Sequence, residues 1–589
     1  MLDHAARSLL ALVVGLSTGC GLVLDLEETP DAAGALVDGG ARVDAASRDA
    51  SVEASVGWLD GAMLSDATYP DAACDNDGDG YCVPEDCNDD DSTVHPNAIP
   101  ICGDDIEQSC AGADARGDDL ACNGRGTFVS ERTGTPAGPG TMDAPFERIG
   151  DAMAIAGTIV PGVNLDIYIA TGTYDEDITL IEGASLLGGH DPSTWRATGD
   201  PSETVLRASN ENPAGTIANP DITPDTEIVR MRLESLAVTD AATLTLYGGA
   251  APTVRNVFVE APNANASGHS YGISIEAGPG TNTPRIIGTT IQLGRSVTGP
   301  TSNPPDYAYG IYDVGSPVHI DNSTFLFSGQ HTVQTAIGLF GTPSRRTMLT
   351  QNQIVAQSDT TTLAIGVVVA GGGAEVVDNT IGIGSCDTLC WGIVVTDTYD
   401  HVSIRNNVIR GGSGPGRDEA GGLLLQYESV TRPLDLQVTS NFVMGGFVGP
   451  STGLRIAITG AIGTGVTIGR FSNNILFSGR VAPSFPVSTS YAWALARPEL
   501  FVHNAIHSYV GGSTVVALGV DITLPGGDQN RLAEDCGVDP TMAFYLDPAS
   551  SCVDAGADRT RVPEVPSSDF EGDPRPMGSG WDIGPDEAR

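Results

Sequence analysis

The chain contains no lysine. All 29 of its Lys+Arg residues are arginines, against 75 aspartates and glutamates, which gives a net charge of −46 over 589 residues. Without a lysine amine, the protein has no side chain for Schiff-base chemistry. The excess of negative charge repels phosphate backbones and anionic lipid, so nucleic acid is excluded as an expected partner.

Apolar runs long enough to span a bilayer are also missing, since residues 9–16 are far shorter than the roughly 20 required. Arg7, this run and the small residues after it predict a signal peptide over residues 1–19. The stretch "LSTGC", ending at Cys20, resembles the lipobox of bacterial lipoproteins, although Leu16 stands four residues before the cysteine rather than three. The resemblance implies a lipidated Cys20 and, because Gly21 follows, an outer-membrane lipoprotein. Simple secretion with a differently spaced cleavage site is the alternative.

Cysteine is sparse, and its grouping is informative. Without Cys20, ten of the 11 cysteines remain, and an even number is typical of disulfides in an oxidising compartment. The spacing favours local bridges, with the connectivity of the first six left open because 15 pairings exist. A metal–thiolate site is the rival interpretation, although the neighbouring oxygen ligands are those of hard cations. The disulfide candidates are Cys74, Cys82, Cys87, Cys102, Cys110, Cys122, Cys386, Cys390, Cys536 and Cys552.

Residues 20–70 are rich in Ala, Asp, Gly and Val and show no periodicity, which predicts a disordered acidic tether. Residues 71–124 follow as a disulfide-rich module containing "CDNDGDGYCVPEDC". Its carboxylates alternate around a glycine, as in a calcium-binding loop, because Ca²⁺ requires six to eight oxygen ligands in a small sphere. A second, glycine-free run follows and offers a second possible ion site. The metal-ligand candidates are Asp75, Asp77, Asp79, Tyr81 (through its carbonyl), Asp86, Asn88 and Asp90.

The calcium loop is not an EF-hand, because Asp86 replaces the final glutamate and no helical patterns flank it. The segment resembles thrombospondin type 3 calcium repeats, and still more a cysteine-containing metal-binding motif of secreted proteins. The resemblance implies a structural calcium ion. A solvated acidic loop held by disulfides is the alternative.

The residue pattern changes in residues 125–207. Phe146, Ile149, Met153 and Ile155 recur near helical spacing, and brief β-rich runs with glycine-bearing turns follow. This passage resembles the first coils of right-handed parallel β-helix proteins of the pectate lyase-like superfamily, in which a short helix caps the open end. The resemblance implies an all-β solenoid.

A repeat spaced by 27 to 35 residues runs through 208–530. A β-propeller would need about 40 to 50 residues per repeat, so the spacing favours a β-solenoid. We expect the third residue of each repeated segment to point inward between apolar neighbours and to form a hydrogen-bonded ladder from coil to coil. These residues are Asn256, Thr289, Asn322, Asn352, Asn379, Asn406, Asn441, Asn473 and Asn504.

A second strand precedes each such segment and carries a recurrent glycine at Gly272, Gly310, Gly338, Gly366, Gly392, Gly422 and Gly453. Residues 531–589 contain "DAG", "GDPRP" and "DIGPDE". They resemble the closing segment of bacterial surface β-helix proteins, which implies a C-terminal segment that covers the final coil.

The fold alone does not decide function, because β-helices serve as polysaccharide-cleaving enzymes, adhesins and passive surface proteins. The motifs "GHG" and "RIK" of polygalacturonase-like sites are absent. We expect no catalytic residues, and a surface-exposed lipoprotein used for adhesion, glycan binding or envelope structure. Its expected partners are the outer membrane and a glycan or envelope protein. The alternative is a polysaccharide lyase or glycoside hydrolase.

Two groups of residues bear on that alternative. The densest ionisable group is Asp397, Asp400, His401, Arg405, Arg410, Arg417, Asp418 and Glu419, for which solvated loop positions and surface ion pairs are the simpler interpretation. The aromatic residues that could stack on sugars, or else pack the coils, are Tyr271, Tyr309, Tyr312, Trp391, Tyr399 and Tyr427.

Overall fold

A computed structural model describes part of the chain. The described residues are 87–88, 91, 94–95, 110, 126–136, 138–156, 165–208, 216–236, 241–263, 268–278, 282–294, 307–327, 333–341, 346–356, 361–384, 386–398, 400–412, 420–428, 430, 432–446, 451–458, 469–478, 485–489, 501–507, 515–517, 520–521, 530–532, 536, 546, 548–563 and 565–588. The chain divides into two compact units, Met1–His95 and Pro96–Arg589. In the first unit, Asp91 N donates to Asn88 O and Val94 N to Asp91 O, which defines a short turn.

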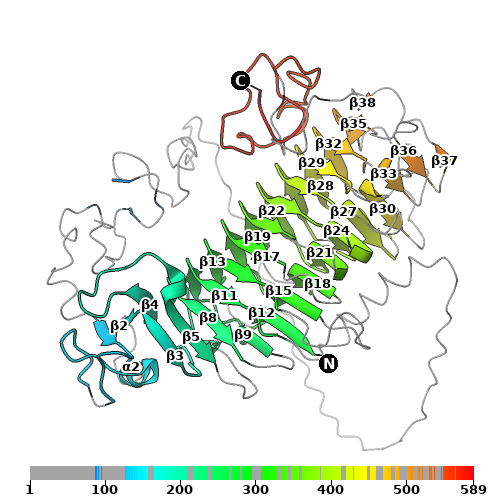
Figure 1. The fold of residues 1–589 in the computed structure, drawn as a ribbon. Helices are drawn as coiled ribbons and strands as arrows, with labels where there is room; N and C mark the ends of the chain where they lie inside the picture. The colour runs from blue at the N-terminus through cyan, green and yellow to red at the C-terminus, as the bar shows by residue number, and fades with distance from the viewer. Residues whose placement is uncertain are drawn as a thin grey trace, which may run out of the picture. The chain divides into compact units, whose positions relative to one another are not determined.

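The second unit is a parallel β-helix made of three sheets, which confirms the predicted fold class (Figure 1). Each coil contributes one strand to each sheet, and the coils stack with their strands in parallel register. The pairings among the described strands are parallel except for β36 with β37 at the end of the third sheet. With about 4.8 Å per coil, the 13 strands of the first sheet extend roughly 60 Å.

Sheet A is the first sheet. Its strands, in spatial order, are β1 (Gly126–Val129), β2 (Leu165–Ala170), β4 (Ala184–His190), β7 (Glu227–Val229), β10 (Thr253–Arg255), β13 (Arg285–Ile287), β16 (His319–Asp321), β19 (Thr347–Thr350), β22 (Ala374–Val377), β25 (Val402–Arg405), β28 (Leu436–Thr439), β31 (Arg470–Ser472) and β34 (Phe501–Val502).

Sheet B follows sheet A within each coil. It consists of β3 (Gly172–Asp175), β5 (Thr204–Ala208), β8 (Arg232–Ser235), β11 (Phe258–Glu260), β14 (Thr290–Gln292), β17 (Thr324–Leu326), β20 (Gln353–Val355), β23 (Thr380–Gly382), β26 (Val408–Arg410), β29 (Phe442–Met444), β32 (Ile475–Phe477), β35 (Ala505–His507) and β38 (Arg531–Leu532).

Sheet C has the longest strands and completes each coil. It consists of β6 (Thr216–Ala218), β9 (Ala241–Leu246), β12 (His269–Glu276), β15 (Tyr307–Val314), β18 (Val333–Phe340), β21 (Thr361–Ala370), β24 (Cys386–Thr396), β27 (Ala420–Tyr427), β30 (Thr452–Ile458), β33 (Phe485–Thr489), β36 (Val515–Ala517) and β37 (Val520–Asp521).

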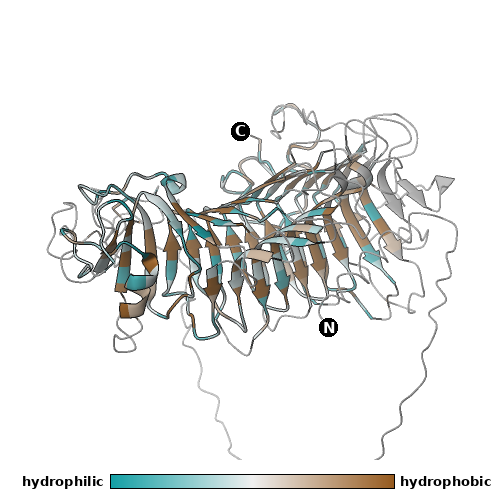
Figure 2. Cartoon of the chain, turned by 60° about the horizontal axis from the view of Figure 1, so that its bottom comes forward, coloured by the Kyte–Doolittle hydropathy of each residue, from teal (hydrophilic) through white to brown (hydrophobic). Residues whose placement is uncertain are grey.

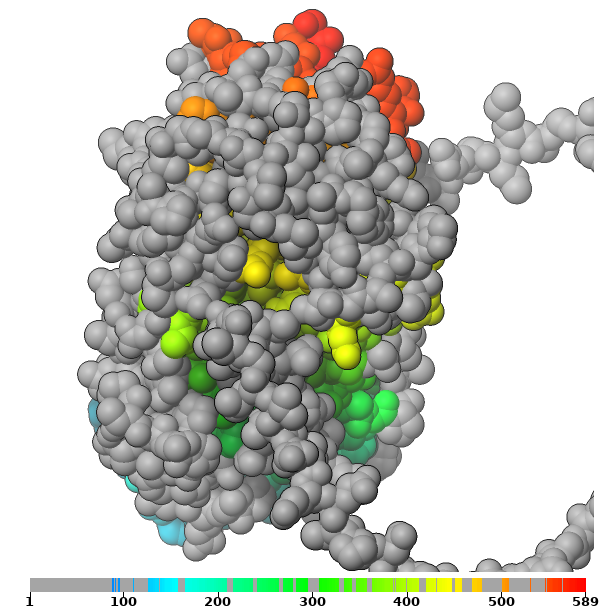
Figure 3. Space-filling view, turned by 90° about the vertical axis from the view of Figure 1, so that its right-hand side faces the viewer, coloured from blue at the N-terminus to red at the C-terminus, as the bar shows by residue number. Residues whose placement is uncertain are grey.

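The core lies inside the coils and is filled by aliphatic side chains from all three sheets. In one coil, for example, Val376 of β22, Ile381 of β23 and Ile393 of β24 are fully buried. Figure 2 shows hydrophobic residues along the strands throughout the domain. In space-filling view the coils follow chain order, from cyan through green and yellow to the orange and red C-terminal segment (Figure 3).

The predicted capping helix is present as α2 (Ile149–Ala156), and a 3-10 turn, η1 (Pro201–Glu203), lies further along. Ile149 and Met153 are buried as expected, whereas Ile155 is 40% exposed, which corrects its place in the apolar face. Glu176 fixes the start of the helix, because its two carboxylate oxygens accept hydrogen bonds from Ile149 N and Gly150 N at 2.9 Å. Such a carboxylate satisfies helix N–H groups that have no partner within the helix.

The turn between sheets A and B is the same in every central coil. One residue there adopts a left-handed conformation with φ between 44° and 57°, and the next points into the core. Only one of these left-handed residues is glycine, and asparagine tolerates this region better than most residues. The left-handed residues are Arg230, Asn256, Gly288, Asn322, Gln351, Asp378, Asn406, Ser440, Asn473 and His503.

The predicted polar ladder exists, but its register was wrong in four of the nine repeats. Asn352, Asn379, Asn441, Asn504 and Thr289 point inward as expected. Asn256, Asn322, Asn406 and Asn473 are instead the left-handed residues, and the inward residues are their neighbours Val257, Ser323, Asn407 and Asn474. Asparagine suits both adjacent positions, so alignment on asparagine alone cannot separate them.

Each ladder amide bonds to the next coil in the same way. Asn379 Oδ1 accepts from Asn352 N at 2.9 Å and from Asn352 Nδ2 at 3.0 Å, and Asn379 Nδ2 donates to Leu349 O at 2.9 Å. The pattern continues to Asn530, an end member that the repeat alignment missed. Since the ladder amides bond to groups of neighbouring coils, the ladder avoids the cost of burying polar atoms.

The recurrent glycines form a column in sheet C, with one correction. In β18 the residue that aligns with Gly310 and Gly366 is Ala336, not Gly338. Gly338 lies two residues further along and pairs with Tyr312. A Cβ at Gly392 would lie 2.5 Å from Ile409 Cγ2 and 2.6 Å from Gly422 O. The column therefore lets sheet C approach the inward side chains of sheet B closely.

Candidate functional site

The predicted calcium site falls largely outside the described residues. Asp75, Asp77, Asp79, Tyr81, Asp86 and Asp90 lie there, as does the predicted lipidation site Cys20. Asn88 is described, and its carbonyl accepts a hydrogen bond from Asp91 N at 2.9 Å. Calcium binding and lipidation therefore stay predictions.

The predicted disulfides are present where the structure describes both partners. Cys386 bonds to Cys390 within β24, and Cys536 bonds to Cys552. Cys87 and Cys110 are also disulfide-bonded. The remaining candidates, Cys74, Cys82, Cys102 and Cys122, lie outside the described residues.

The described members of the ionisable group singled out from the sequence do not form one site. His401 Nδ1 lies 3.0 Å from Asp435 Oδ2, and Asp397 Oδ1 accepts a hydrogen bond from Glu428 N. Arg405 belongs to sheet A and Arg410 to sheet B, so the two arginines lie on different walls of the coil. Asp400 is exposed, and Arg417, Asp418 and Glu419 lie outside the described residues.

Acidic and basic side chains from successive coils do meet, but as ion pairs. Glu375 lies 3.1 Å from Arg346 and 3.0 Å from Arg405, and these three residues come from three adjacent coils. On sheet B, Glu234 lies 3.0 Å from Arg207 and 2.6 Å from Arg232. Exposed pairs of this kind neutralise charge and contribute little stability, typically below about 1 kcal/mol each.

The aromatic residues fall into two groups. Trp391 and Tyr427 are fully buried, and Tyr399 lies outside the described residues. The others cluster on β12, β15 and β18 of sheet C, together with His269, Tyr307 and Phe340. His269 and Tyr307 stack face to face at 5.1 Å with planes 6° apart, and Tyr271 and Tyr309 stack at 5.8 Å.

Rings from neighbouring coils stack on one another in this aromatic cluster. The faces of rings that stack on a ring of the next coil are occupied by that neighbour. Burial also raises the pKa of the Tyr309 hydroxyl, which is 5% exposed. These contacts pack neighbouring coils against one another, and they favour coil packing over sugar stacking as the role of the cluster.

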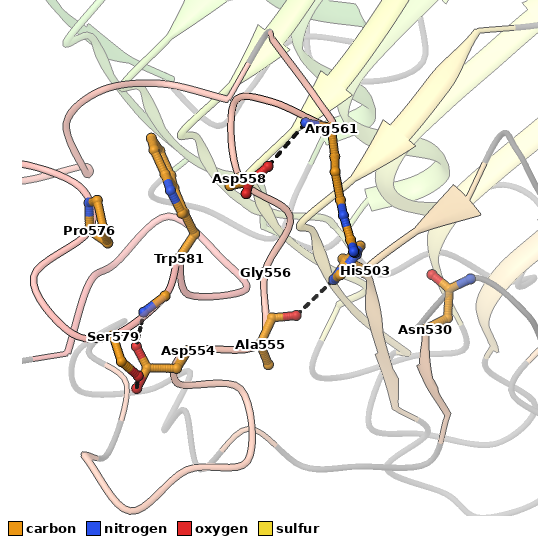
Figure 4. Close-up of a pocket in the computed structure, with 11 residues that line it drawn as sticks. His503, Asn530, Asp554, Ala555, Gly556, Asp558, Arg561, Pro576, Ser579 and Trp581 are labelled. Carbon is orange, nitrogen blue, oxygen red and sulfur yellow. Dashed lines mark hydrogen bonds between the residues drawn. The ribbon is translucent and has the colours of Figure 1, made fainter.

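A cavity lies where the C-terminal segment, residues 546–588, meets the last coils. It has a volume of about 730 Å³. Figure 4 shows Trp581, Pro576 and Ser579 on one side and His503, Arg561 and Asn530 on the other. No local sequence pattern marks this site, because its walls come from positions up to 78 residues apart (503 and 581).

The described part of the C-terminal segment lies along the flank of the last coils. Asn473 Nδ2 donates to Ala557 O at 3.0 Å, and Ala557 N donates to Asn473 Oδ1 at 2.7 Å. Asn406 Nδ2 donates to Ser568 O at 3.0 Å. The left-handed turn residues of the last coils thus bind the segment.

Apolar contacts support the same placement. Val408, Phe442, Met444, Ile475 and Phe477 point outward from sheet B and form one buried cluster with Leu546, Cys552 and Ile583.

A group of buried carboxylates surrounds Arg575 in this segment. Burial raises the pKa of Asp586 to about 6 and that of Glu587 to about 7, and Arg575 opposes both shifts. Asp569, Glu571 and Asp573 lie close enough to hold a cation. However, Asp569 Oδ1 already accepts from Glu571 N and Asp573 N, so its geometry is that of a turn. We assign no metal there.

Comparisons with known proteins give fold similarity alone. No protein-family model matches the chain, and no curated protein matches it. Among solved structures, "pectate lyase Pel9A" is 13% identical over 79% of this chain and 96% of its own, with a TM-score of 0.30. The A-module of the Azotobacter vinelandii mannuronan C-5 epimerase AlgE4 is 13% identical over 65% and 90%, with a TM-score of 0.28. At these values neither match indicates the activity of this chain.

In the described part of the chain, no helix is long and apolar enough to cross a membrane.

Proposed function

We propose that this protein is a surface-anchored lipoprotein of the bacterial envelope, whose β-helix is a non-catalytic rod that binds glycan or another envelope component. One observation carries the non-catalytic part of the proposal. In the described coils, charged side chains of neighbouring coils form ion pairs, as Glu375 does with Arg346 and Arg405. Catalysis of glycan cleavage instead requires an acid and a base held beside a substrate cavity.

The carboxylates near the described cavity fit this proposal. Asp554 Oδ2 accepts from Ser579 Oγ at 2.8 Å, and Asp558 Oδ1 accepts from Thr560 N at 3.1 Å and Arg561 N at 3.0 Å. Hydrogen bonds lower the pKa of Asp558, so this carboxyl is unsuited to donate a proton at neutral pH. Both carboxylates stabilise their own loops.

Anchoring and calcium binding belong to the same proposal and rest on the sequence. Lipidation at Cys20 would hold the acidic tether at the outer membrane. Calcium would stabilise the module of residues 71–124, with an expected dissociation constant on the order of 10⁻⁴ to 10⁻³ M, as in extracellular modules.

The test of the non-catalytic role is direct. The full chain, purified in detergent, is incubated with pectate, alginate and α-1,3-glucan, and both reducing ends and unsaturated products are measured. We expect neither product above the buffer control. Release of either product would establish the alternative, a polysaccharide lyase or glycoside hydrolase.

Anchoring is tested by radiolabelled fatty-acid incorporation in the bacterium. The wild-type chain is expected to carry the label, and Cys20→Ala is expected to lose it. Calcium binding is tested by titrating Ca²⁺ into the chelator-treated full chain, with Asp77→Asn as the variant. Absence of heat in the wild type would remove the calcium proposal and leave the glycan proposal standing.

A further inference from the structure

The cavity between the C-terminal segment and the last coils has features of a binding site. Its volume of about 730 Å³ lies within the range typical of small-ligand sites. The walls combine one indole with several planar polar side chains, namely Arg561, Asn530, Asp554 and Asp558.

Trp581 is held so that part of its indole faces the cavity. It is half-buried and packs against Ala557, Val562 and Val565, which form a small apolar cluster of the C-terminal segment. Figure 4 shows the indole standing in the cavity wall opposite Arg561. An indole with one supported side offers a rigid apolar surface at low entropic cost.

His503 orients Arg561 on the opposite wall. The imidazole is 6% exposed, and its Nδ1 lies 2.9 Å from Ala555 O, to which it donates. Nε2 is therefore the acceptor in the neutral ring, and it lies 3.4 Å from Arg561 Nη1. His503 is also a left-handed turn residue of the coil, so the last coil fixes the position of the guanidinium.

We propose that this cavity is a binding site for a neutral saccharide, with Trp581 stacking on the apolar face of a sugar ring and Arg561 donating to its oxygens. This inference rests on the glycan-binding role proposed above and gives it a location. Sugar rings have apolar C–H faces and hydroxyl rims, which match an aromatic wall flanked by planar donors and acceptors.

Charge selects neutral over acidic sugars. Two carboxylates, Asp554 and Asp558, and one guanidinium, Arg561, line the cavity, so the formal charge of its walls is negative. The whole chain adds a net charge of −46. A uronate would be repelled by both, whereas hydroxyl groups can donate to carboxylates and accept from arginine.

A cationic peptide side chain is the competing occupant, because an indole and two carboxylates also attract cations. Arg561 disfavours this occupant, because its positively charged guanidinium lines the same cavity and would repel a second cation. We therefore commit to the saccharide.

The test uses the full chain in detergent on an array of neutral oligosaccharides of glucose, mannose, galactose and xylose, with oligogalacturonate and poly-arginine as the charged probes. Hits are quantified by calorimetry. We expect binding of at least one neutral oligosaccharide. Trp581→Ala and Arg561→Gln should each weaken it at least about tenfold, as expected for a central aromatic or arginine contact.

Two variants control for local misfolding. Trp581→Phe keeps a stacking ring and should retain most of the affinity. Arg559→Gln removes a neighbouring exposed arginine that does not line the cavity, and should bind like wild type.

The outcomes separate this inference from the proposed function. Neutral oligosaccharide binding that Trp581→Ala and Arg561→Gln leave unchanged would overturn the cavity assignment and keep the glycan-binding role. Absence of binding to every oligosaccharide on the array, oligogalacturonate included, would overturn both. Binding of oligogalacturonate or poly-arginine alone would overturn the assigned ligand class.

Discussion

The outer face of sheet B differs between the first and the last coils. In β8, β11 and β14 it carries the polar side chains Arg232, Glu234, Glu260 and Gln292, which are partly exposed. In β29 and β32 the corresponding face carries apolar side chains that are fully buried. The strands pair in parallel in both regions. The difference therefore lies in the side chains, which are apolar where the C-terminal segment covers sheet B.

The polar ladder differs between the same regions. In the earlier coils its inward positions hold Val257, Thr289 and Ser323, whereas from Asn352 onward they hold asparagine. A hydroxyl has one donor, and an amide has two donors and an acceptor with two lone pairs. The later coils are therefore joined by more side-chain hydrogen bonds per step.

The largest expected effect is on the ladder. Asn441 accepts from Asn407 N and Nδ2 at 2.9 Å and donates to Asn474 Oδ1 at 3.0 Å. Asn441→Ala leaves several buried groups unsatisfied, and the free energy of unfolding should fall by about 4 kcal/mol. Urea denaturation followed by circular dichroism measures the loss.

Ser323→Ala is the matched variant in the earlier coils. Its hydroxyl accepts a hydrogen bond from Thr289 N at 3.1 Å and donates one to Asp321 O at 2.8 Å, and the loss should be about 1 to 2 kcal/mol. Equal losses for the two variants would contradict the difference between the two regions of the ladder.

The second prediction concerns the covered face of sheet B. Phe442→Ala removes a fully buried ring under the C-terminal segment and should cost about 3 kcal/mol. Phe258 occupies the same column in β11, where it is partly exposed and lies 5.1 Å from the Arg232 guanidinium. Phe258→Ala should cost about 1 kcal/mol or less, because exposed positions are rarely sensitive. Limited proteolysis should release the C-terminal segment faster in Phe442→Ala alone.

The third prediction tests the glycine column. Gly392→Ala places a Cβ 2.5 Å from Ile409 Cγ2, and this overpacking should cost about 2 kcal/mol. Ala336 shows that one coil already accommodates a methyl group in this column, so Ala336→Gly should cost about 1 kcal/mol at most. Thermal unfolding compares the two. An unchanged thermal stability of Gly392→Ala would show that the close approach of the sheets is not required.

The smallest expected effect is pH dependence in the C-terminal segment. A carboxyl whose pKa is raised in the folded state binds its proton more tightly there than in the unfolded chain. For Asp586 (about 6) and Glu587 (about 7), the stabilisation is present at about pH 4 and is lost as pH rises through 6 and 7.

Exposed Asp191 in the first coils has the opposite shift. The Ser193 hydroxyl and neighbouring amides lower its pKa to about 2, so its contribution is lost only in strong acid. Urea midpoints from about pH 5 to pH 8 should therefore decline, and Glu587→Gln should reduce the decline because the amide does not titrate. A midpoint that rises with pH equally in both proteins would refute the assignment.

The architecture could be predicted from the sequence because each repeat shows the same local residue pattern. Apolar alternation, the recurrent asparagine and the glycines before each segment follow from the strand period and the demands of a buried wall. The disulfides Cys386–Cys390 and Cys536–Cys552 also followed from short separations.

The register of the ladder was harder, because one residue type satisfies two adjacent requirements. Asn406 and Asn407 stand side by side, one in the left-handed turn and one in the core. Only the pairing of neighbouring coils distinguishes them. The same reason explains Gly338, which lies two residues from the column that sequence alignment assigned it to.

The amino-acid sequence by itself determined the solenoid, since each coil repeats a pattern whose inward residues need stacked partners to be satisfied. It also determined the net charge of −46, from which we expect no nucleic-acid partner. Tertiary structure alone decided where residues 546–588 lie and that Trp581, Arg561 and His503 share a cavity. The physical reason is distance along the chain. Local periodicity encodes the coils, whereas a contact such as that between Asn406 and Ser568, 162 residues apart, depends on where the folded coils place their donor groups.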